Sequence, residues 1–347
     1  MKSIIFSLLI ILTIILMTNC ASQVSRSSLE ADFQFVQLYP VMGDPVDFDV
    51  SKQCVFVAED EVGFSIIDKN SSNLIIRVDE FSFIQIRSVP LVKYNHDFNI
   101  LFVVDRSMGH VLYSLKIDSL STSFEDYATQ RIIGSAYNVR DIAFSNIIGD
   151  SIRFNMFLTN FKYDQQRNEF VKGTYNSNAI ENPLTMVPTA VPNAVLKIKL
   201  TDNYIATAMG QRGLYFLSRE ELTEISQIST PGEARDMVIN GNIIYIADRQ
   251  HGLQVLDVSD IYNPLLLQNS SRSTDGFATS IDMSDRFLAV GSGSGGVYLY
   301  DISNPAVPIL INRLEEDQIG YVHKVMFFER DLYIASRTKG IVRYQIK

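Results

Sequence analysis

The sequence predicts an all-β protein that is built from a repeated unit. From Asp32 onward, runs of about five β-branched and aromatic residues alternate with Gly, Asn, Asp and Pro, which is the pattern of short strands joined by tight turns. No long stretch has the 3.6-residue period of an amphipathic helix, and Glu220–Ile228 has room for only one or two turns. The 347 residues, of which 46% are apolar, suffice for a large buried core.

The C-terminal part of the chain repeats with a period of 44 residues. The clearest units read GEARDMVINGNIIYIADRQHGLQVLD from Gly232 and GFATSIDMSDRFLAVGSGSGGVYLYD from Gly276, and a third unit starts at Gly320. Each unit contains a small residue that is followed five positions later by a glycine, which predicts a hairpin between two strands. A period of about 40–50 residues is typical of the four-stranded blades of β-propellers.

Seven such units align between Val46 and Lys347, at a mean spacing of 46 residues. The first strand of each unit is predicted to begin at Val46, Ile86, Val139, Ala194, Ala234, Ala278 and Val322. One blade per unit predicts a seven-bladed β-propeller, and the alternative is an open or six-bladed ring. The third unit lacks the hairpin signature over Ser151–Ala190 and is predicted to be elongated or distorted.

The two ends of the chain predict how the ring closes. The chain ends at Lys347, just after the third strand of the seventh unit, so that this unit lacks an outer strand. Phe33–Tyr39 lies 13 residues before Val46, which is the spacing that separates Ile309 from Val322. Phe33–Tyr39 is therefore expected to be the outer strand of the last blade, where it removes an open sheet edge.

Two of the repeats resemble those of a known family. The segments LQVLDVSDIYNP and VYLYDISNPAVP, which start at Leu253 and Val297, resemble the LVIVD repeats of bacterial β-propeller lipoproteins. The resemblance extends in weaker form over Val46–Lys347 and implies the propeller fold. It implies little about activity, because propellers serve many unrelated functions.

The N-terminal segment is predicted to direct the protein to a membrane. Ile4–Met17 is almost wholly apolar; it is shorter than the roughly 20 residues of a membrane span and suits a signal peptide. Cys20 follows this segment and resembles the lipidated cysteine of a bacterial lipobox, although Asn19 replaces the usual small residue. The alternatives are an ordinary cleaved signal and an uncleaved anchor.

The chain therefore divides into three predicted parts. Residues 1–19 are a lipoprotein signal peptide, residues 20–31 are the lipidated cysteine and a flexible, serine-rich tether, and residues 32–347 are a single propeller domain. A fatty acid on Cys20 would hold the protein in the bacterial cell envelope. The outer membrane or the cell surface is favoured over the inner membrane.

Composition and motifs argue against several classes of function. A net charge of −9 is unsuited to nucleic acid, whose phosphates need a basic face. Two cysteines give no disulfide framework, and Cys54 is expected to be an inert core thiol. No two of the four histidines have metal-ligand spacing, and Glu59–Glu61 is expected to be a solvated turn. Without a hydrolase, zinc-protease or phosphate-loop motif, no catalytic residue, metal or cofactor is predicted.

A recurring basic position suggests a binding site. The residue after the predicted start of the first strand is basic in four units: Arg87, Arg140, Arg235 and His323. Because equivalent positions meet around the channel of a propeller, these side chains are predicted to form a basic collar that binds a small carboxylate or phosphate. The alternative, which is favoured because buried charges need partners, is that the arginines form ion pairs within and between blades. Their candidate partners are Asp47, Asp141 and Asp236.

These observations favour a binding function. The leading hypothesis is a membrane-anchored, non-catalytic propeller that binds an envelope or extracellular protein, or another ligand such as a small anion. One alternative is an envelope enzyme, of hydrolase or lyase type, with a site at the channel mouth. Another is a scaffold for outer-membrane assembly.

Overall fold

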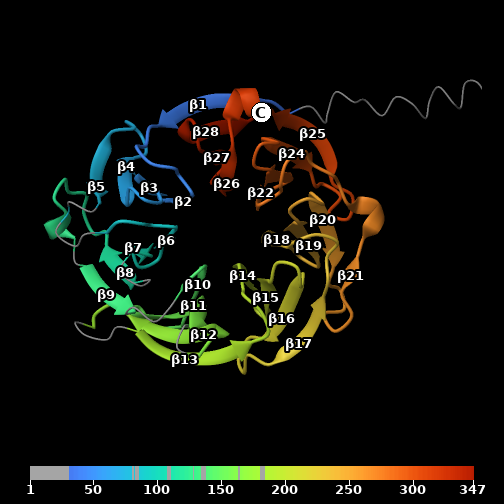
Figure 1. Ribbon diagram of the computed structural model, residues 1–347, viewed down its shortest axis with the longest axis horizontal. Helices are drawn as coiled ribbons and strands as arrows, with labels where there is room; N and C mark the ends of the chain where they lie inside the picture. The colour runs from blue at the N-terminus through green and yellow to red at the C-terminus, as the bar shows by residue number, and fades with distance from the viewer. Residues whose placement is uncertain are drawn as a thin grey trace, which may run out of the picture.

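The described residues form seven four-stranded antiparallel sheets, arranged as blades around a central axis (Figure 1). The computed structural model describes residues 31–79, 82, 86–107, 111–127, 129–133, 138–162, 165–179 and 184–347. The first strand of each blade lies nearest the axis and the fourth lies at the outer wall. The prediction of an all-β, seven-bladed propeller is confirmed, and the open or six-bladed alternative is wrong.

The blades are numbered in the order of their inner strands along the chain. Blade 1 contains β2 (Asp47–Val50), β3 (Cys54–Ala58), β4 (Phe64–Asp68) and β5 (Leu74–Val78). Blade 2 contains β6 (Leu91–Asn95), β7 (Ile100–Asp105), β8 (Val111–Lys116) and β9 (Thr129–Ile133). Blade 3 contains β10 (Ile142–Asn146), β11 (Arg153–Lys162), β12 (Arg167–Asn176) and β13 (Leu184–Val191). Blade 4 contains β14 (Lys197–Leu200), β15 (Tyr204–Ala208), β16 (Leu214–Ser218) and β17 (Glu224–Ile228).

The last three blades include both ends of the described chain. Blade 5 contains β18 (Asp236–Asn240), β19 (Ile243–Ala247), β20 (Leu253–Asp257) and β21 (Leu265–Leu266). Blade 6 contains β22 (Ser280–Ser284), β23 (Phe287–Gly291), β24 (Val297–Asp301) and β25 (Ile309–Leu314). Blade 7 contains β26 (Val322–Phe328), β27 (Asp331–Ser336), β28 (Gly340–Ile346) and β1 (Phe33–Tyr39).

Strand β1 closes the ring as predicted. It pairs with β28 in antiparallel fashion, with one register shift. Tyr39, its last residue, is fully buried; its ring stacks on Tyr333 of the same blade, and its hydroxyl donates to the carbonyl of Lys69 in blade 1, at 2.8 Å. Phe35 and Leu38 of this strand are 58% and 41% exposed. Closure therefore depends on backbone pairing and on Tyr39 more than on Phe35 and Leu38.

The hydrophobic core lies between neighbouring blades. Side chains on one face of a strand meet those of the next blade, as where Phe56 of blade 1 stacks on Tyr94 of blade 2, with ring centroids 4.8 Å apart. The recurring glycines serve the hairpins: Gly252 and Gly296 have φ of 67° and 77°, and a Cβ there would lie 2.4 and 1.9 Å from a main-chain oxygen. This explains why the repeat requires glycine at these positions.

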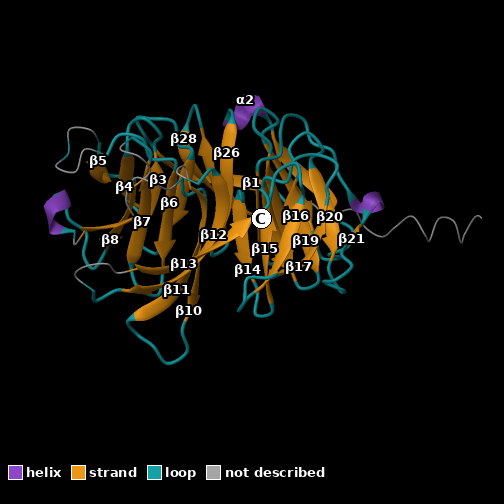
Figure 2. Cartoon of the chain, turned by 60° about the horizontal axis from the view of Figure 1, so that its bottom comes forward, coloured by secondary structure: helices purple, strands orange, loops and turns teal. Residues whose placement is uncertain are grey.

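Blade 3 is elongated, as predicted, because β11 and β12 have 10 residues each. The segment with weak helical character, Glu220–Ile228, instead ends in the strand β17. The described helices are short: η2 (Phe124–Asp126), η3 (Gln268–Ser270) and α2 (Glu316–Ile319). Figure 2 shows the strands running between the two faces of the disc, with α2 at one of them. No helix in the described ranges is long and apolar enough to cross a membrane.

Most of the predicted membrane-directing segment lies outside the described residues. This applies to the signal peptide at 1–19, to Cys20 and to the tether as far as residue 30. Ala31, predicted to be the last tether residue, is 2% exposed, and its carbonyl accepts a hydrogen bond from Nδ2 of Asn312 at 2.7 Å. The folded body thus begins at least one residue earlier than predicted.

Candidate functional site

One face of the disc carries two kinds of connection. These are the hairpins between second and third strands and the segments that lead from each outer strand to the next inner strand. Isolated backbone bridges join the two kinds of connection side by side: Asp60–Val89, Gly210–Ala234, Arg249–Ala278 and Gly293–Val322. We call this surface the hairpin face.

These contacts correct the predicted alignment of the second unit. The bridge from Asp60 ends at Val89, so Val89 and not Ile86 is equivalent to Ala234. Arg87 therefore precedes the position of Arg235 by three residues. In four blades, the backbone N–H at the position of Arg235 donates to the carbonyl of the last residue of the second strand. The pairs are Val46–Ala58, Leu196–Ala208, Arg235–Ala247 and Thr279–Gly291. The predicted starts of the inner strands in units one and four thus also differ from the observed ones, by one residue each.

Three of the four predicted collar residues do share one position, namely Arg140, Arg235 and His323. Arg235 forms an ion pair with Glu233, with Nη2 and Oε1 2.9 Å apart, and Glu233 also pairs with Arg249 of the neighbouring hairpin. Ion pairing was the predicted alternative, but the partner is Glu233 rather than Asp47, Asp141 or Asp236. Arg140 and Arg87 are exposed. Whether the collar binds an anion remains a prediction.

His323 lies in a compact charged cluster between blades 7 and 1. It is the extra residue of a bulge in β26, where the register shifts between Val322 and Lys324, and a bulge re-aims the side chain. Its Nε2 lies 2.7 Å from Oδ1 of Asp44, whose Oδ2 accepts from Nε of Arg337 at 3.0 Å. Burial lowers the pKa of His323, which outweighs the opposing effect of Asp44.

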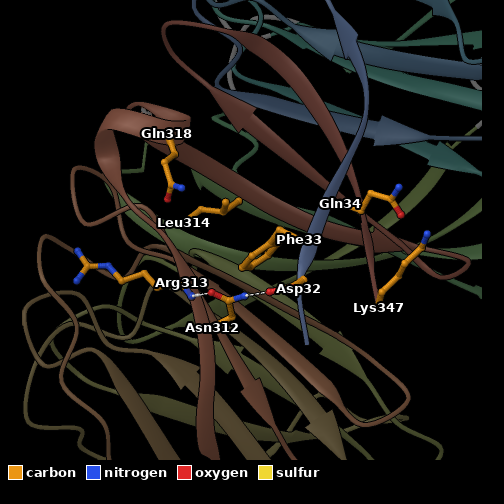
Figure 3. A pocket seen from close by; sticks show the side chains of 8 residues that line it. All are labelled: Asp32, Phe33, Gln34, Asn312, Arg313, Leu314, Gln318 and Lys347. Carbon is orange, nitrogen blue, oxygen red and sulfur yellow. Dashed lines mark hydrogen bonds between the residues drawn. The ribbon is translucent and has the colours of Figure 1, made fainter. Parts of the chain in front are cut away.

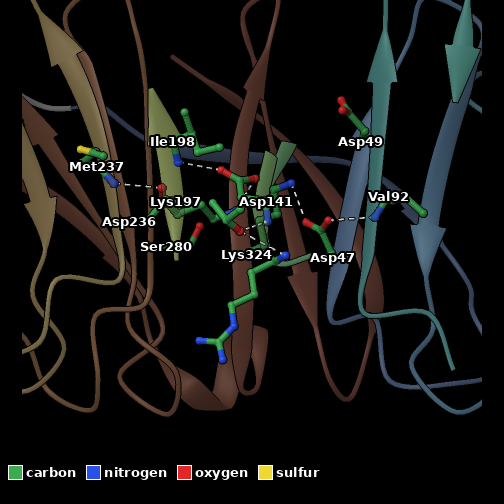
Figure 4. Close-up of polar contacts among 12 residues, drawn as sticks. Asp47, Asp49, Val92, Asp141, Lys197, Ile198, Asp236, Met237, Ser280 and Lys324 are labelled. Atoms are coloured by element: carbon green, nitrogen blue, oxygen red, sulfur yellow. Dashed lines mark hydrogen bonds and ion pairs between the residues drawn. The ribbon is translucent and has the colours of Figure 1, made fainter. Parts of the chain in front are cut away.

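The inner strands present a ring of side chains that the collar prediction overlooked. These side chains sit one residue beyond the collar position, and we call them the first channel ring: Asp47, Leu91, Asp141, Lys197, Asp236, Ser280 and Lys324. Figure 4 shows six of them converging on the axis from different blades. Nζ of Lys324 lies 2.6 Å from Oδ1 of Asp47, and Nζ of Lys197 lies 3.7 Å from Oδ1 of Asp141.

The acids of this ring hold neighbouring blades together. Asp47 accepts from the N–H of Val92 at 3.1 Å, and Asp141 accepts from the N–H of Ile198 at 2.8 Å. Asp236 accepts from the N–H of Ile281 in the same way, at 3.3 Å (Figure 4 shows the Asp47 and Asp141 bonds). An inner strand is a sheet edge with unpaired N–H groups, and the carboxylate of the preceding blade satisfies them.

A second ring repeats this arrangement two residues further along each inner strand. Its members, the second channel ring, are Asp49, Lys93, Ala143, Lys199, Val238, Asp282 and Met326. Asp49 accepts from the N–H of Tyr94 at 2.9 Å, and Asp282 accepts from the N–H of Phe327 at 2.7 Å. A sequence signal for both rings existed: the pair Asp47 and Asp49 points two carboxylates to one side of a strand, and each partner lies 45 residues later.

The two rings border a cavity of about 390 Å³ in the channel. Four aspartates and four lysines line it, so that its formal charge is balanced. Burial alone would lower the pKa of Lys197, but the nearby carboxylates of Asp141 and Asp236 raise it, so this lysine stays charged. Burial raises the pKa of Asp282, while Lys199 opposes the shift.

Buried polar residues also fasten the hairpins. Glu59 is fully buried and accepts from the N–H groups of Met42 and Gly43, at 2.7 and 2.8 Å, and pairs with Arg77 at 3.3 Å. Asp248 is fully buried at the equivalent position in blade 5. The prediction of a solvated turn at Glu59–Glu61 is therefore wrong for Glu59, which fixes the segment that enters the first inner strand.

Thiol and metal chemistry find no support in the described part of the chain. Cys54 is 1% exposed, and burial raises its pKa to about 12, as expected for an inert core thiol. Cys20 lies outside the described residues. Among the residues that the structure describes, no three His, Cys, Asp or Glu side chains are grouped as metal ligands.

Comparisons with known proteins agree with the fold. A computationally designed protein, Ika8, superimposes with a TM-score of 0.61 at 11% identity, covering 90% of this chain and 100% of that one. The WD40 β-propeller domain of Doa1 gives 0.66 at 12% identity, covering 90% and 97%. The β-propeller domain of Cps50 (Swd1) from Myceliophteria thermophila gives 0.63 at 9% identity, covering 91% and 100%. At these identities the likeness concerns the fold alone.

Sequence comparison adds a specific feature. The family model of the LVIVD repeat matches residues 231–270 and 275–315, which are blades 5 and 6 with their flanking turns. Curated proteins give no sequence match. The architecture fits a non-catalytic binding protein. The chain is a seven-bladed β-propeller that carries LVIVD repeats.

Proposed function

We propose that this protein is a lipid-anchored binding protein of the bacterial cell envelope, and that its hairpin face engages a protein partner. The observation that carries the second part is a set of arginines stacked on aromatic rings at this face. The guanidinium of Arg249 lies 5.0 Å from the ring centre of Phe277, and that of Arg337 lies 4.9 Å from the ring centre of Tyr321. Phe277 is 48% exposed.

Such pairs suit protein recognition. Arginine and aromatic side chains are enriched among the residues that contribute most to protein–protein affinity. Here the acids Glu233 and Asp44 hold the arginines in place, at the hairpins of blades 5 and 7. The surface is therefore preorganised, which lowers the entropy lost when a partner binds.

The start of the described chain supports an anchor that leaves this face free. Ala31 is held against Asn312 of β25, so the chain emerges from the outer wall between blades 6 and 7. A groove of about 630 Å³ lies there between β25 and β1, and Figure 3 shows Phe33 and Asn312 at its walls. Strand β1 then runs toward the hairpin face, because Tyr39 precedes the segment into β2.

The same wall exposes apolar side chains. Ile309 and Leu310 of β25 are 45% and 48% exposed, and Phe35 and Val36 of β1 are 58% and 41% exposed. A lipid on Cys20 is separated from Ala31 by residues 21–30 alone, which reach at most about 36 Å. We propose that this wall faces the bilayer, where exposed apolar groups are stabilised by the interface.

Affinity capture from cross-linked membranes tests the binding surface. The double variant Phe277→Ser, Arg249→Ser should lose a stoichiometric partner that the parent protein retains. The matched control is Tyr262→Ser, because Tyr262 is 72% exposed and lies in the β20–β21 connection on the opposite face. If the hairpin-face variant captures the same partner as the parent, or if only the control loses it, the proposed surface is wrong.

A further inference from the structure

We propose that the central channel binds a small dianion, a phosphate ester or a dicarboxylate, between Lys93 and Lys199. This site is separate from the collar, which lies nearer the hairpin face, and it depends neither on the membrane anchor nor on the protein partner. It differs from the rest of the channel in one respect: among the described residues, neither of its two cations forms a hydrogen bond or an ion pair.

The two lysines occupy the same position in alternate blades. Both belong to the second channel ring, Lys93 on β6 and Lys199 on β14, and both line the 390 Å³ cavity. Blade 3 stands between them, and it contributes only Ala143 at the equivalent position. Blade 3 thus places a methyl group in the ring where blades 2 and 4 place a long cationic side chain.

Neither ammonium group has a hydrogen bond or ion pair with any described residue. The other two lysines of the cavity do: Lys324 is paired with Asp47, and Lys197 with Asp141. Both unpaired side chains are only partly exposed. An ammonium group presents three donors. A ligand oxygen that enters the cavity can accept from them.

The nearby carboxylates accept hydrogen bonds from the backbone. Asp49 accepts from the N–H groups of Val50 and Tyr94, both at 2.9 Å, and Asp282 accepts from the N–H of Phe327. These acids serve the inner strand edges and form no ion pair with the two lysines, although the charge of Lys199 favours the ionised form of Asp282. The two lysines are therefore cations that keep donors available for a ligand in this part of the channel.

The chemistry of the walls narrows the ligand class. Two ammonium groups are compact point charges, which suit oxyanions that carry two negative charges. Ile198, Ile281 and Met326 also line the cavity. They provide an apolar wall for a short carbon skeleton. A phosphate ester and a dicarboxylate share these features, and the test distinguishes them.

The lysines could instead only neutralise the aspartates of the channel, and the variant Lys93→Met, Lys199→Met separates the two roles. Met326 already occupies the equivalent position in blade 7, so methionine fits the ring. Under our proposal, the double variant keeps the thermal unfolding midpoint of the parent or exceeds it, because two unpaired like charges are removed. A purely neutralising role would lower the midpoint.

Isothermal titration of the full-length protein in detergent tests binding with two probes, inorganic phosphate and succinate. We expect at least one probe to bind the parent at millimolar concentration or below, and its affinity to fall about tenfold or more in the double variant. The control Lys116→Met, at an exposed lysine of β8 outside the channel, should bind as the parent does. Binding of one probe alone identifies the ligand class. The proposal is wrong if neither probe binds the parent, or if the double variant binds as tightly as the parent.

Discussion

Nζ of Lys324 lies 2.6 Å from Oδ1 of Asp47, although the two residues are 277 positions apart in the chain. The same ammonium group donates to the carbonyl of Phe48 at 2.7 Å. Lys324 belongs to the last inner strand and Asp47 to the first, so this contact closes the ring at its centre, while β1 closes it at the outer wall. The two closures are separate and can be tested separately.

The central closure predicts that paired and unpaired channel lysines differ in their contribution to stability. The side chains of Lys324 and Asp47 are 15% and 8% exposed, so Lys324→Met should lower the free energy of unfolding by about 2–3 kcal/mol, between the values for surface and fully buried pairs. The matched variant is Lys93→Met in the same cavity, which should change it by no more than about 0.5 kcal/mol. Urea unfolding measures both, and equal losses would contradict the assignment of partners.

The outer closure predicts a contrast within one strand. Tyr39→Ala removes a fully buried ring and its hydrogen bond to blade 1, and should cost about 3–5 kcal/mol. Phe35→Ala affects a ring that is 58% exposed, and should cost about 1 kcal/mol or less. Thermal and urea unfolding of the two variants check this order. A larger loss for Phe35→Ala would mean that the strand is held by its outward face.

The repeat could be predicted from the sequence because it is local. Hairpin glycines such as Gly252 and Gly296 are required by backbone conformation within one unit, and their spacing therefore reveals the blade period. The sequence predicts strand β1 in the same way, from its distance to the following unit. These features depend on short stretches of chain, where residue type and structure are directly linked.

The candidate site was predicted less well because it depends on contacts between blades. In the second unit the repeat is diluted, so the sequence indicates Ile86 as the start in place of Val89 and places Arg87 in the collar. The partner of Arg235 is Glu233, two residues away, and not a channel aspartate. Three acids in a row resemble an exposed turn, so the sequence predicts a solvated Glu59. Its burial depends instead on Arg77 and on the segment before β2.

Arg235 and Arg77 both have acidic partners, but their different environments predict unequal contributions to the free energy of unfolding. Arg235 is 35% exposed and Glu233 keeps Arg249 as a partner, so Arg235→Ala should cost no more than about 1 kcal/mol. Arg77 is 15% exposed and its partner Glu59 is fully buried, so Arg77→Ala leaves a buried carboxylate without its cation and should cost about 3 kcal/mol. Urea unfolding compares the two, and a loss of 3 kcal/mol or so at Arg235 as well would show a more buried pair than the structure contains.

The two cysteines predict a clear test of the anchor. Metabolic labelling with a fatty acid should mark the parent protein and Cys54→Ala, because Cys54 is a buried core residue. It should not mark Cys20→Ala, which should also leave the detergent phase in a partition experiment. Labelling of Cys20→Ala at the parent level would contradict the lipidation of Cys20. Loss of labelling in Cys54→Ala alone would show that the lipid is attached to Cys54 and not to Cys20.

The cluster around His323 predicts a pH dependence of stability. Burial lowers the pKa of His323 from 6.5, so the unfolded chain binds a proton more readily than the folded one. By linkage, the stabilising contribution of the neutral imidazole is fully present above about pH 6.5 and is lost as the pH falls below it. His323→Gln retains a polar side chain beside Asp44 but cannot titrate. Between about pH 7.5 and 5, the free energy of unfolding should therefore fall more in the parent than in His323→Gln. Urea unfolding across this range measures the difference, and parallel curves for the two proteins would show that His323 binds protons equally in both states.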